Sequence, residues 1–342
     1  MANYTRLASD DKVIYTEKVT TNTWTNNSNN LVTAFTSSLQ ADFSSPSSSG
    51  YFYIDVYQTG SQDSTAEVQY SVAYGHKNGS GSMDFTNDTG SFGLSATKCT
   101  YNQYRNLVFG DSSQEFTFGT HTPDHIYVIN MSRARYKHAI KPGALNLKLS
   151  GSVGGFLLLT DDSVTQTGSA TLTNVGRQFN IVSGADGVMS GSQLGQIGGS
   201  SSYGLFYPDA GFMILNPDNV GSFLTNLNPA ENPNCSGCKN NEKLQRSLKD
   251  GAYFISDSEE QVTSQYYFIR LKNQDYNYST NPTFKLTNGN LRFTSMHDNP
   301  RTYITTIGLY NDNSELLAVA KLSQPLSKDF SKEALIRCKL EY

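Results

Sequence analysis

The fold class of this chain is decided by the stretch Glu67-Val68-Gln69-Tyr70-Ser71-Val72-Ala73-Tyr74, in which apolar and polar residues alternate. Successive side chains of a β-strand point to opposite faces, so this pattern predicts a strand with one buried face. Residues 51–57 (YFYIDVY) are aromatic and β-branched and predict a second strand. The turn-rich residues 59–65 connect the two. Together these segments predict a β-rich fold.

The rest of the sequence continues this pattern with few helical interruptions. Further strands are predicted at residues 125–130, 145–149, 156–159 and 265–271. Residues 302–310 and 315–322, joined by four turn-forming residues, predict a β-hairpin. Helices are expected at residues 98–108 and 240–249, where apolar residues recur at helical spacing. The expected fold class is therefore mainly β, with β-sandwich-like sheets and a few short helices.

The length of 342 residues suggests about two domains, preceded by an N-terminal arm. Residues 1–50 are assigned to this arm and its linker because they are rich in Ser, Thr and Asn. The arm either packs loosely or orders against neighbouring subunits, with Trp24 as a residue that it can bury. The remaining assignments are a central β-rich domain at 51–230, a polar connector at 231–250 and a C-terminal β domain at 251–342.

The composition favours protein interfaces over charged ligands. Charged residues make up 16% of the chain, against about 25% in an ordinary globular protein. The 21 tyrosines and 18 phenylalanines can supply contact area at a small entropic cost. The net charge is −4 and no basic block is visible, which argues against dedicated nucleic-acid binding. No apolar run is long enough for a transmembrane helix and no secretory signal is recognisable, so we expect synthesis in a cytoplasm without membrane association.

The motifs that carry common chemistries are missing from the sequence. It contains no P-loop, no H-E-x-x-H and no G-x-S-x-G, so we expect no enzyme, no catalytic residue and no cofactor. Asp161 and Asp162 are adjacent and are interpreted as part of a solvated turn. His121 and His125 have helical spacing but are separated by Pro123, which favours a solvated loop over a metal site.

Cys235-Ser236-Gly237-Cys238 is the sharpest local motif. Its two thiolates could share a zinc ion with a remote Cys or His, or form a redox pair. The Pro- and Asn-rich surroundings favour a third interpretation, an inert pair in an exposed loop. Cys235 and Cys238 are therefore only weak metal candidates, and no metal is predicted.

Five residues are candidates for contacts with other subunits. Arg133 and Arg135 alternate with uncharged residues, so on an extended segment they would share one face with Lys137. That face suits a bridge to a carboxylate of another element or subunit, or alternatively a nucleic-acid contact. Trp24, Tyr207 and Tyr310 complete the predicted interface set.

Three segments resemble virion proteins of contractile-tailed bacteriophages. Residues 303–321 (YITTIGLYNDNSELLAVAK) resemble a hairpin of phage tail-collar and tail-fibre attachment domains. Residues 124–136 and 203–209 are similar to segments of uncharacterised structural proteins of large contractile-tailed phages, cyanobacterial ones among them. The resemblance implies a tail, baseplate or neck-adaptor subunit, present in several copies in a symmetric virion assembled in the host cytoplasm with other tail proteins. No repetitive fibrous stretch follows the hairpin, which argues against a fibre.

Two other functions remain open at this point. Exposed Tyr, Asn and Asp residues in the loops at 75–90 and 184–202 could make the chain a receptor- or glycan-binding module of the virion. A particle-associated hydrolase would need paired carboxylates or a nucleophile with its base, and no specific residues stand out for that role.

Overall fold

The computed structural model describes residues 4–36, 53–80, 96–151, 155–165, 170–190, 202–221, 224, 240–279 and 281–342. The chain divides into two compact units. Unit 1 consists of Met1–Lys18 and Gln261–Tyr342, and unit 2 of Val19–Glu260. The fold is mainly β, as the sequence predicts.

Unit 2 is built on one large antiparallel sheet, which has twelve strands within the described residues. The strand order is β14-β7-β8-β10-β12-β13-β5-β4-β3-β2, with β9 and β11 also paired to β10. The bounds are β2 Phe35–Thr36, β3 Tyr53–Tyr57, β4 Val68–His76, β5 His125–Met131, β7 Asn146–Ser150, β8 Phe156–Asp161, β9 Thr171–Thr173, β10 Gly176–Ala185, β11 Val188–Met189, β12 Gly204–Tyr207, β13 Phe212–Leu215 and β14 Phe254–Ile255. The strands predicted in this part of the sequence are confirmed.

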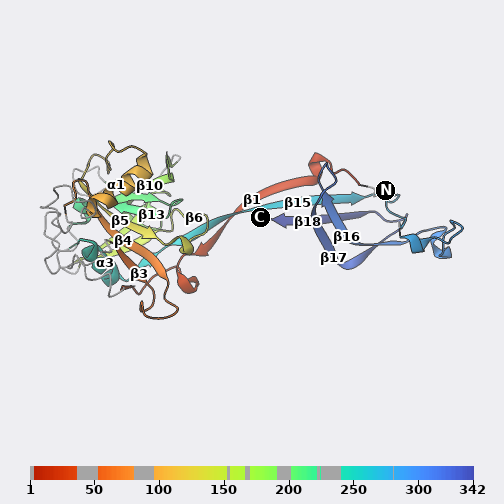
Figure 1. Ribbon diagram of the computed structural model, residues 1–342, viewed down its shortest axis with the longest axis horizontal. Helices are drawn as coiled ribbons and strands as arrows, with labels where there is room; N and C mark the ends of the chain where they lie inside the picture. Colours follow the sequence, from red (N-terminus) through yellow and green to blue (C-terminus); the bar gives the residue numbers. More distant parts are fainter. Residues whose placement is uncertain are drawn as a thin grey trace. The chain divides into compact units, whose positions relative to one another are not determined.

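Two helices cover the sheet on opposite faces (Figure 1). Helix α1, Ala96–Phe109, packs Tyr101 and Val108 into a cluster with residues of β5, β12 and β13. Helix α3, Asn240–Gly251, contributes Leu244 and Leu248 to the larger core on the other face. Both helices are confirmed predictions. A one-turn helix, α2, Pro217–Val220, follows β13 and is capped by the side chain of Asn216.

The N-terminal segment closes the sheet of unit 2. The sheet curls until Tyr70 of β4 and Phe254 of β14 meet with ring centroids 5.3 Å apart. Trp24 packs against both rings, at 6.2 and 4.8 Å, and its indole N–H donates a 2.8 Å hydrogen bond to the carbonyl of Phe254. The chain then continues to β2, which pairs with β3. Residues 23–36 therefore join one end of the sheet to the other.

This position corrects the predicted arm and connector. Trp24 is only 2% exposed and Leu31 lies in the same core, so the arm prediction is wrong for residues 19–36. The connector predicted at 231–250 is wrong from Asn240 onward, because α3 packs in the core of unit 2. Residues 37–50 and 231–239 lie outside the described residues. Sequence composition could not reveal these contacts because their partners are distant in the chain.

Unit 1 contains a three-stranded path and a separate hairpin. Strands β1 (Lys12–Asn22), β15 (Asp257–Leu271) and β18 (Ala334–Glu341) lie in the order β1-β15-β18. The first residues of β15 pair with β6, Ala139–Ile140, within unit 2. The hairpin is formed by β16, Thr302–Tyr310, and β17, Leu316–Lys328, which confirms the predicted one. The boundary between the units falls within β1, after Lys18, and within β15, after Glu260.

We expect Trp24→Ala to lower the free energy of unfolding of unit 2 by about 4 kcal/mol, because it leaves a large cavity between the two ends of the sheet. Trp24→Phe retains a ring but loses the hydrogen bond to Phe254, and should cost less than half as much. Urea unfolding followed by far-UV circular dichroism measures both. A cost below about 1 kcal/mol for the alanine variant would contradict this role for Trp24.

Candidate functional site

Among the described residues, exposed large hydrophobic side chains are most numerous in unit 1, and together we call them the apolar surface of unit 1. They are Tyr4, Val13, Ile14, Tyr15, Tyr276, Tyr278, Leu286, Phe293, Tyr303, Tyr310, Leu316, Leu317, Val319, Leu326, Phe330, Leu335 and Tyr342. The buried hydrophobic residues described in unit 1 are Leu271, Phe284 and Cys338 alone. Unit 1 therefore exposes most of the apolar material from which a domain builds its core.

Polar groups form much of the small interior that unit 1 does have. Lys328, on β17, is fully buried, and its ammonium donates 2.9 Å hydrogen bonds to the carbonyl of Asn273 and to Oδ1 of Asn277. Asp329 beside it is also buried and accepts hydrogen bonds from Ser331. A buried ammonium held by neutral oxygens contributes little net stability. The strands of unit 1 thus lack an apolar core of their own.

The structure separates the five predicted interface residues. Trp24 and Tyr207 are buried in unit 2 and are not available to another subunit, so these two assignments are wrong. Their aromatic character reflects intramolecular packing, which a sequence cannot distinguish from interface packing. Tyr310 is exposed and belongs to the apolar surface of unit 1, where its ring contacts that of Tyr4 at 4.8 Å.

Arg133 and Arg135 belong to a 3-10 turn, Arg133–Arg135, so the shared face that they would have on an extended segment is not formed. Arg133 donates to the carbonyl of Tyr136 at 2.6 Å and lies over its ring. Arg135 forms the predicted kind of bridge within the chain, to the carboxylate of Glu67 at 2.7 Å, and also binds Thr25. Both side chains have partners on their own chain, and Arg135 holds the segment around Thr25 in place.

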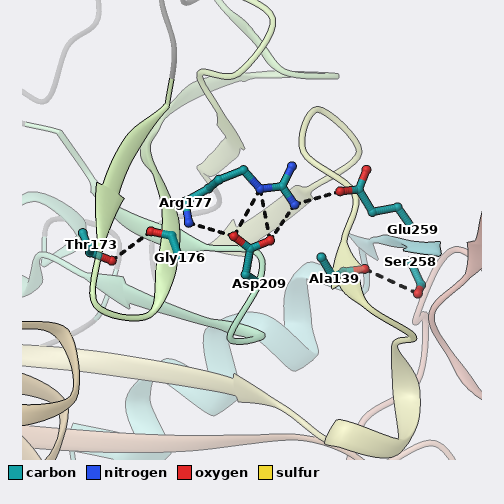
Figure 2. A network of polar contacts seen from close by, with 7 residues as sticks. All are labelled: Ala139, Thr173, Gly176, Arg177, Asp209, Ser258 and Glu259. Atoms are coloured by element: carbon teal, nitrogen blue, oxygen red, sulfur yellow. Dashed lines mark hydrogen bonds and ion pairs between the residues drawn. The ribbon is translucent and has the colours of Figure 1, made fainter. Parts of the chain in front are cut away.

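A three-residue ionic network ties the first residues of β15 to the sheet of unit 2 (Figure 2). Arg177, on β10, donates from Nε and Nη2 to Asp209 Oδ1 at 3.0 and 2.6 Å, and from Nη2 to Glu259 Oε1 at 2.7 Å. Asp209 lies in the β12–β13 turn and Glu259 in β15. The hydrogen bonds to Asp209, and then those to Glu259, raise the pKa of Arg177 above its ordinary value.

Two neighbouring features fix the geometry of this network. Gly176 has a φ of +106°, and a Cβ there would lie 2.4 Å from Asp209 Oδ2, so only glycine lets the carboxylate reach the backbone N–H of Arg177. Ser258 accepts a 2.7 Å hydrogen bond from the N–H of Lys137 and donates to the carbonyl of Ala139. The network is a structural clamp on β15.

A second polar cluster joins α2 to the beginning of β5. The carboxylate of Asp218 lies between two imidazoles: Oδ2 is 2.7 Å from Nε2 of His121, and Oδ1 is 3.3 Å from Nε2 of His125. His76 of β4 lies opposite His125 of β5, and their rings are stacked with the centroids 6.0 Å apart. The hydrogen bond from His125, followed by that from His121, lowers the pKa of Asp218 to about 2. The solvated loop predicted for His121 and His125 is wrong for His125, which is only 8% exposed at the start of β5, whereas His121 lies in the preceding loop and contacts the same carboxylate.

Tyr74 and Tyr127 lie beside this histidine cluster, and the ring of Tyr74 packs against those of His125 and Tyr127. Both hydroxyls are buried and have no hydrogen-bond partner among the described residues. Burial raises the pKa of both phenols above the ordinary value. A carboxylate–imidazole pair can relay protons, but the geometry here is that of a tether: one carboxylate joins the loop at His121, strand β5 and helix α2.

The remaining candidates do not form a site. Asp161 and Asp162 are buried, so the predicted solvated turn is wrong: Asp161 binds the N–H groups of Gly143 and Ser163, and Asp162 binds Asn180. Cys235 and Cys238 lie outside the described residues. Within the part of the chain that the structure describes, no three His, Cys, Asp or Glu residues are placed to hold a metal ion, and no helix has the length and hydrophobicity to cross a membrane.

Comparisons with known proteins yield no match, either to a family model, to a curated protein or to a solved structure.

We expect Asp209→Asn to lower the free energy of unfolding of unit 2 by about 2 kcal/mol, because it leaves the guanidinium of Arg177 with one carboxylate instead of two. The fluorescence of Trp24, the only tryptophan, reports this transition during urea unfolding. Asp250→Asn, at an exposed position of α3, is the matched control. It should change the free energy of unfolding by less than about 0.5 kcal/mol, as ordinary surface substitutions do. Equal effects of the two variants would refute the clamp.

We expect the tether at Asp218 to make unit 2 sensitive to acid. Its folded pKa of about 2 lies below the ordinary 3.8, so the stabilisation is fully present above pH 3.8 and is lost as the pH falls towards 2. After allowance for solvent screening of this partly exposed side chain, the loss is about 1 kcal/mol. Asp218→Asn should lower the free energy of unfolding of unit 2 by that amount at pH 7. It should also make this free energy less dependent on pH between pH 4 and pH 2. Asp124→Asn, an exposed carboxylate nearby, should retain the wild-type profile.

Proposed function

We propose that the chain is a structural, non-enzymatic subunit of a bacteriophage virion, in the tail or baseplate or as a neck adaptor, and that it acts by assembling with other virion proteins. The observation that carries this proposal is the apolar surface of unit 1. An exposed apolar surface of this extent is unfavourable in water and is typical of proteins that function only in complexes.

The virion as the place of assembly is supported by the resemblance of residues 303–321 to hairpins of phage tail-collar and tail-fibre attachment domains. That segment coincides with β16, the connecting turn and the first part of β17. It carries five members of the apolar surface of unit 1: Tyr303, Tyr310, Leu316, Leu317 and Val319. The hairpin that carries the resemblance therefore also contributes several exposed side chains to the apolar surface of unit 1.

The proposal is tested on the phage that encodes the chain. We expect quantitative mass spectrometry of purified virions to find the chain at a fixed copy number, and deletion of its gene to stop tail assembly at a defined intermediate that the wild-type chain rescues. Electron microscopy of the lysate identifies that intermediate. Absence of the chain from purified virions, or normal infectious tails after deletion, would contradict the proposed function. Binding of the isolated chain to a glycan array, with the deletion leaving assembly intact, would favour a receptor-binding module instead.

A further inference from the structure

We propose that Lys328 and Asn277 form a covalent cross-link within unit 1, an amide bond between Nζ of the lysine and Cγ of the asparagine. Both residues are buried, at 1% and 7% exposure, and Nζ lies 2.9 Å from Oδ1 of Asn277. Because a C=O bond is about 1.23 Å long, Nζ lies within about 4.1 Å of the carbon that it attacks. A displacement of less than about 1 Å brings the two atoms to the near-attack separation of about 3–3.5 Å.

One backbone carbonyl holds both of the nitrogen atoms that take part. The carbonyl oxygen of Asn273 accepts a 2.9 Å hydrogen bond from Nζ of Lys328 and a 2.6 Å hydrogen bond from Nδ2 of Asn277. The nitrogen that attacks and the nitrogen that leaves are therefore oriented by the same oxygen. Such fixed positions replace the random encounter that makes this reaction slow between free molecules.

The backbone beside Asn277 is fastened to the strand that carries Lys328. Tyr276 has a φ of +56°, in the left-handed region that is unfavourable for a tyrosine. Its carbonyl accepts a 2.9 Å hydrogen bond from Oγ1 of Thr302, and Thr302 lies opposite Lys328 in the register of β16 and β17. The strained loop is thus held at the residue that pairs with Lys328, which keeps the asparagine against the lysine.

The reaction exchanges one amide for another and consumes no co-reactant. The ammonium of Lys328 passes one proton to Oδ1 along the existing hydrogen bond, and the electron pair that this frees on Nζ forms the bond to Cγ. The bond between Cγ and Nδ2 then breaks, and its electron pair stays on the nitrogen. A second proton from Nζ and the proton on Oδ1 move to this nitrogen, which leaves as an ammonium ion.

The product removes an unfavourable feature of unit 1. A buried ammonium whose acceptors are neutral oxygens is costly, whereas the amide is neutral and the released ammonium ion is solvated by water. The bond also closes residues 277–328 into a loop that contains β16 and β17, and it restricts the unfolded chain as a disulfide would. A covalent link therefore gives unit 1 the cohesion that its small interior does not supply.

The test is the mass of the full recombinant chain, produced without any other virion protein. We expect intact mass spectrometry under denaturing conditions to give a mass below that of the sequence by one ammonia molecule. After trypsin digestion we expect a branched peptide that joins residues 273–285 to residues 322–332, because trypsin does not cleave after an acylated lysine. Fragmentation of this peptide places the bond between Asn277 and Lys328.

Two variants remove the reacting groups, and each has a matched control. Lys328→Arg retains the positive charge, but its guanidinium stays protonated and is not a nucleophile, so this variant should have the full mass. Lys321→Arg, at an exposed lysine of the same strand, should form the bond like the wild type. Asn277→Ala should also have the full mass, whereas Asn273→Ala retains the backbone carbonyl and should still form the bond.

A wild-type chain of full mass would overturn the cross-link, whether or not the variants fold. A loss of ammonia that persists in Lys328→Arg would also overturn it, because a succinimide at an Asn-Gly pair such as Asn288 and Gly289 gives the same loss without a branched peptide. The cross-link concerns unit 1 alone and does not rest on the proposed function. Its failure leaves the virion role to be decided by the copy number of the chain in purified particles.

Discussion

The fold of unit 2 depends on the packing of Trp24 between Tyr70 and Phe254. These two rings belong to strands close to opposite ends of the sheet order, and a curled sheet that leaves its ends apart would expose its core to water. The indole fills the space and also satisfies a backbone carbonyl at the seam. The core that contains Leu244 and Leu248 lies inside the curl and remains dry only while this seam is closed.

The local structure could be predicted from the sequence because it is encoded by neighbours. The alternation at Val68, Tyr70 and Val72 specified β4, and the four turn residues after Tyr310 specified the hairpin. The division of the chain could not be predicted in this way. Residues 19–36 have the composition of a linker, yet their stability comes from Phe254 and Gln69, which no local pattern connects to them.

The candidate surfaces were only partly predictable for a related reason. Tyr207 and Tyr310 are the same residue type at the end of apolar strands, but Tyr207 is enclosed by α1 and its sheet, whereas Tyr310 is 44% exposed on its hairpin even though Tyr4 packs against it. Periodicity identifies a strand face as apolar without saying which chain buries it. No pattern in the sequence indicated the clamp at Arg177, because its two carboxylates come from a turn and a strand that lie far along the sequence.

The closure by the N-terminal segment has a consequence for the order of events during synthesis. Trp24 leaves the ribosome more than two hundred residues before Phe254, and β1 leaves it long before its sheet neighbour, β15. Each unit can therefore fold only after contacts of long sequence separation become available. A chain that ends before Phe254 lacks the partner of Trp24 in unit 2, and a chain that ends before β18 lacks the third strand of unit 1. Unit 2 can thus close before β18, the last strand of unit 1, has been synthesised, so the two units are completed one after the other.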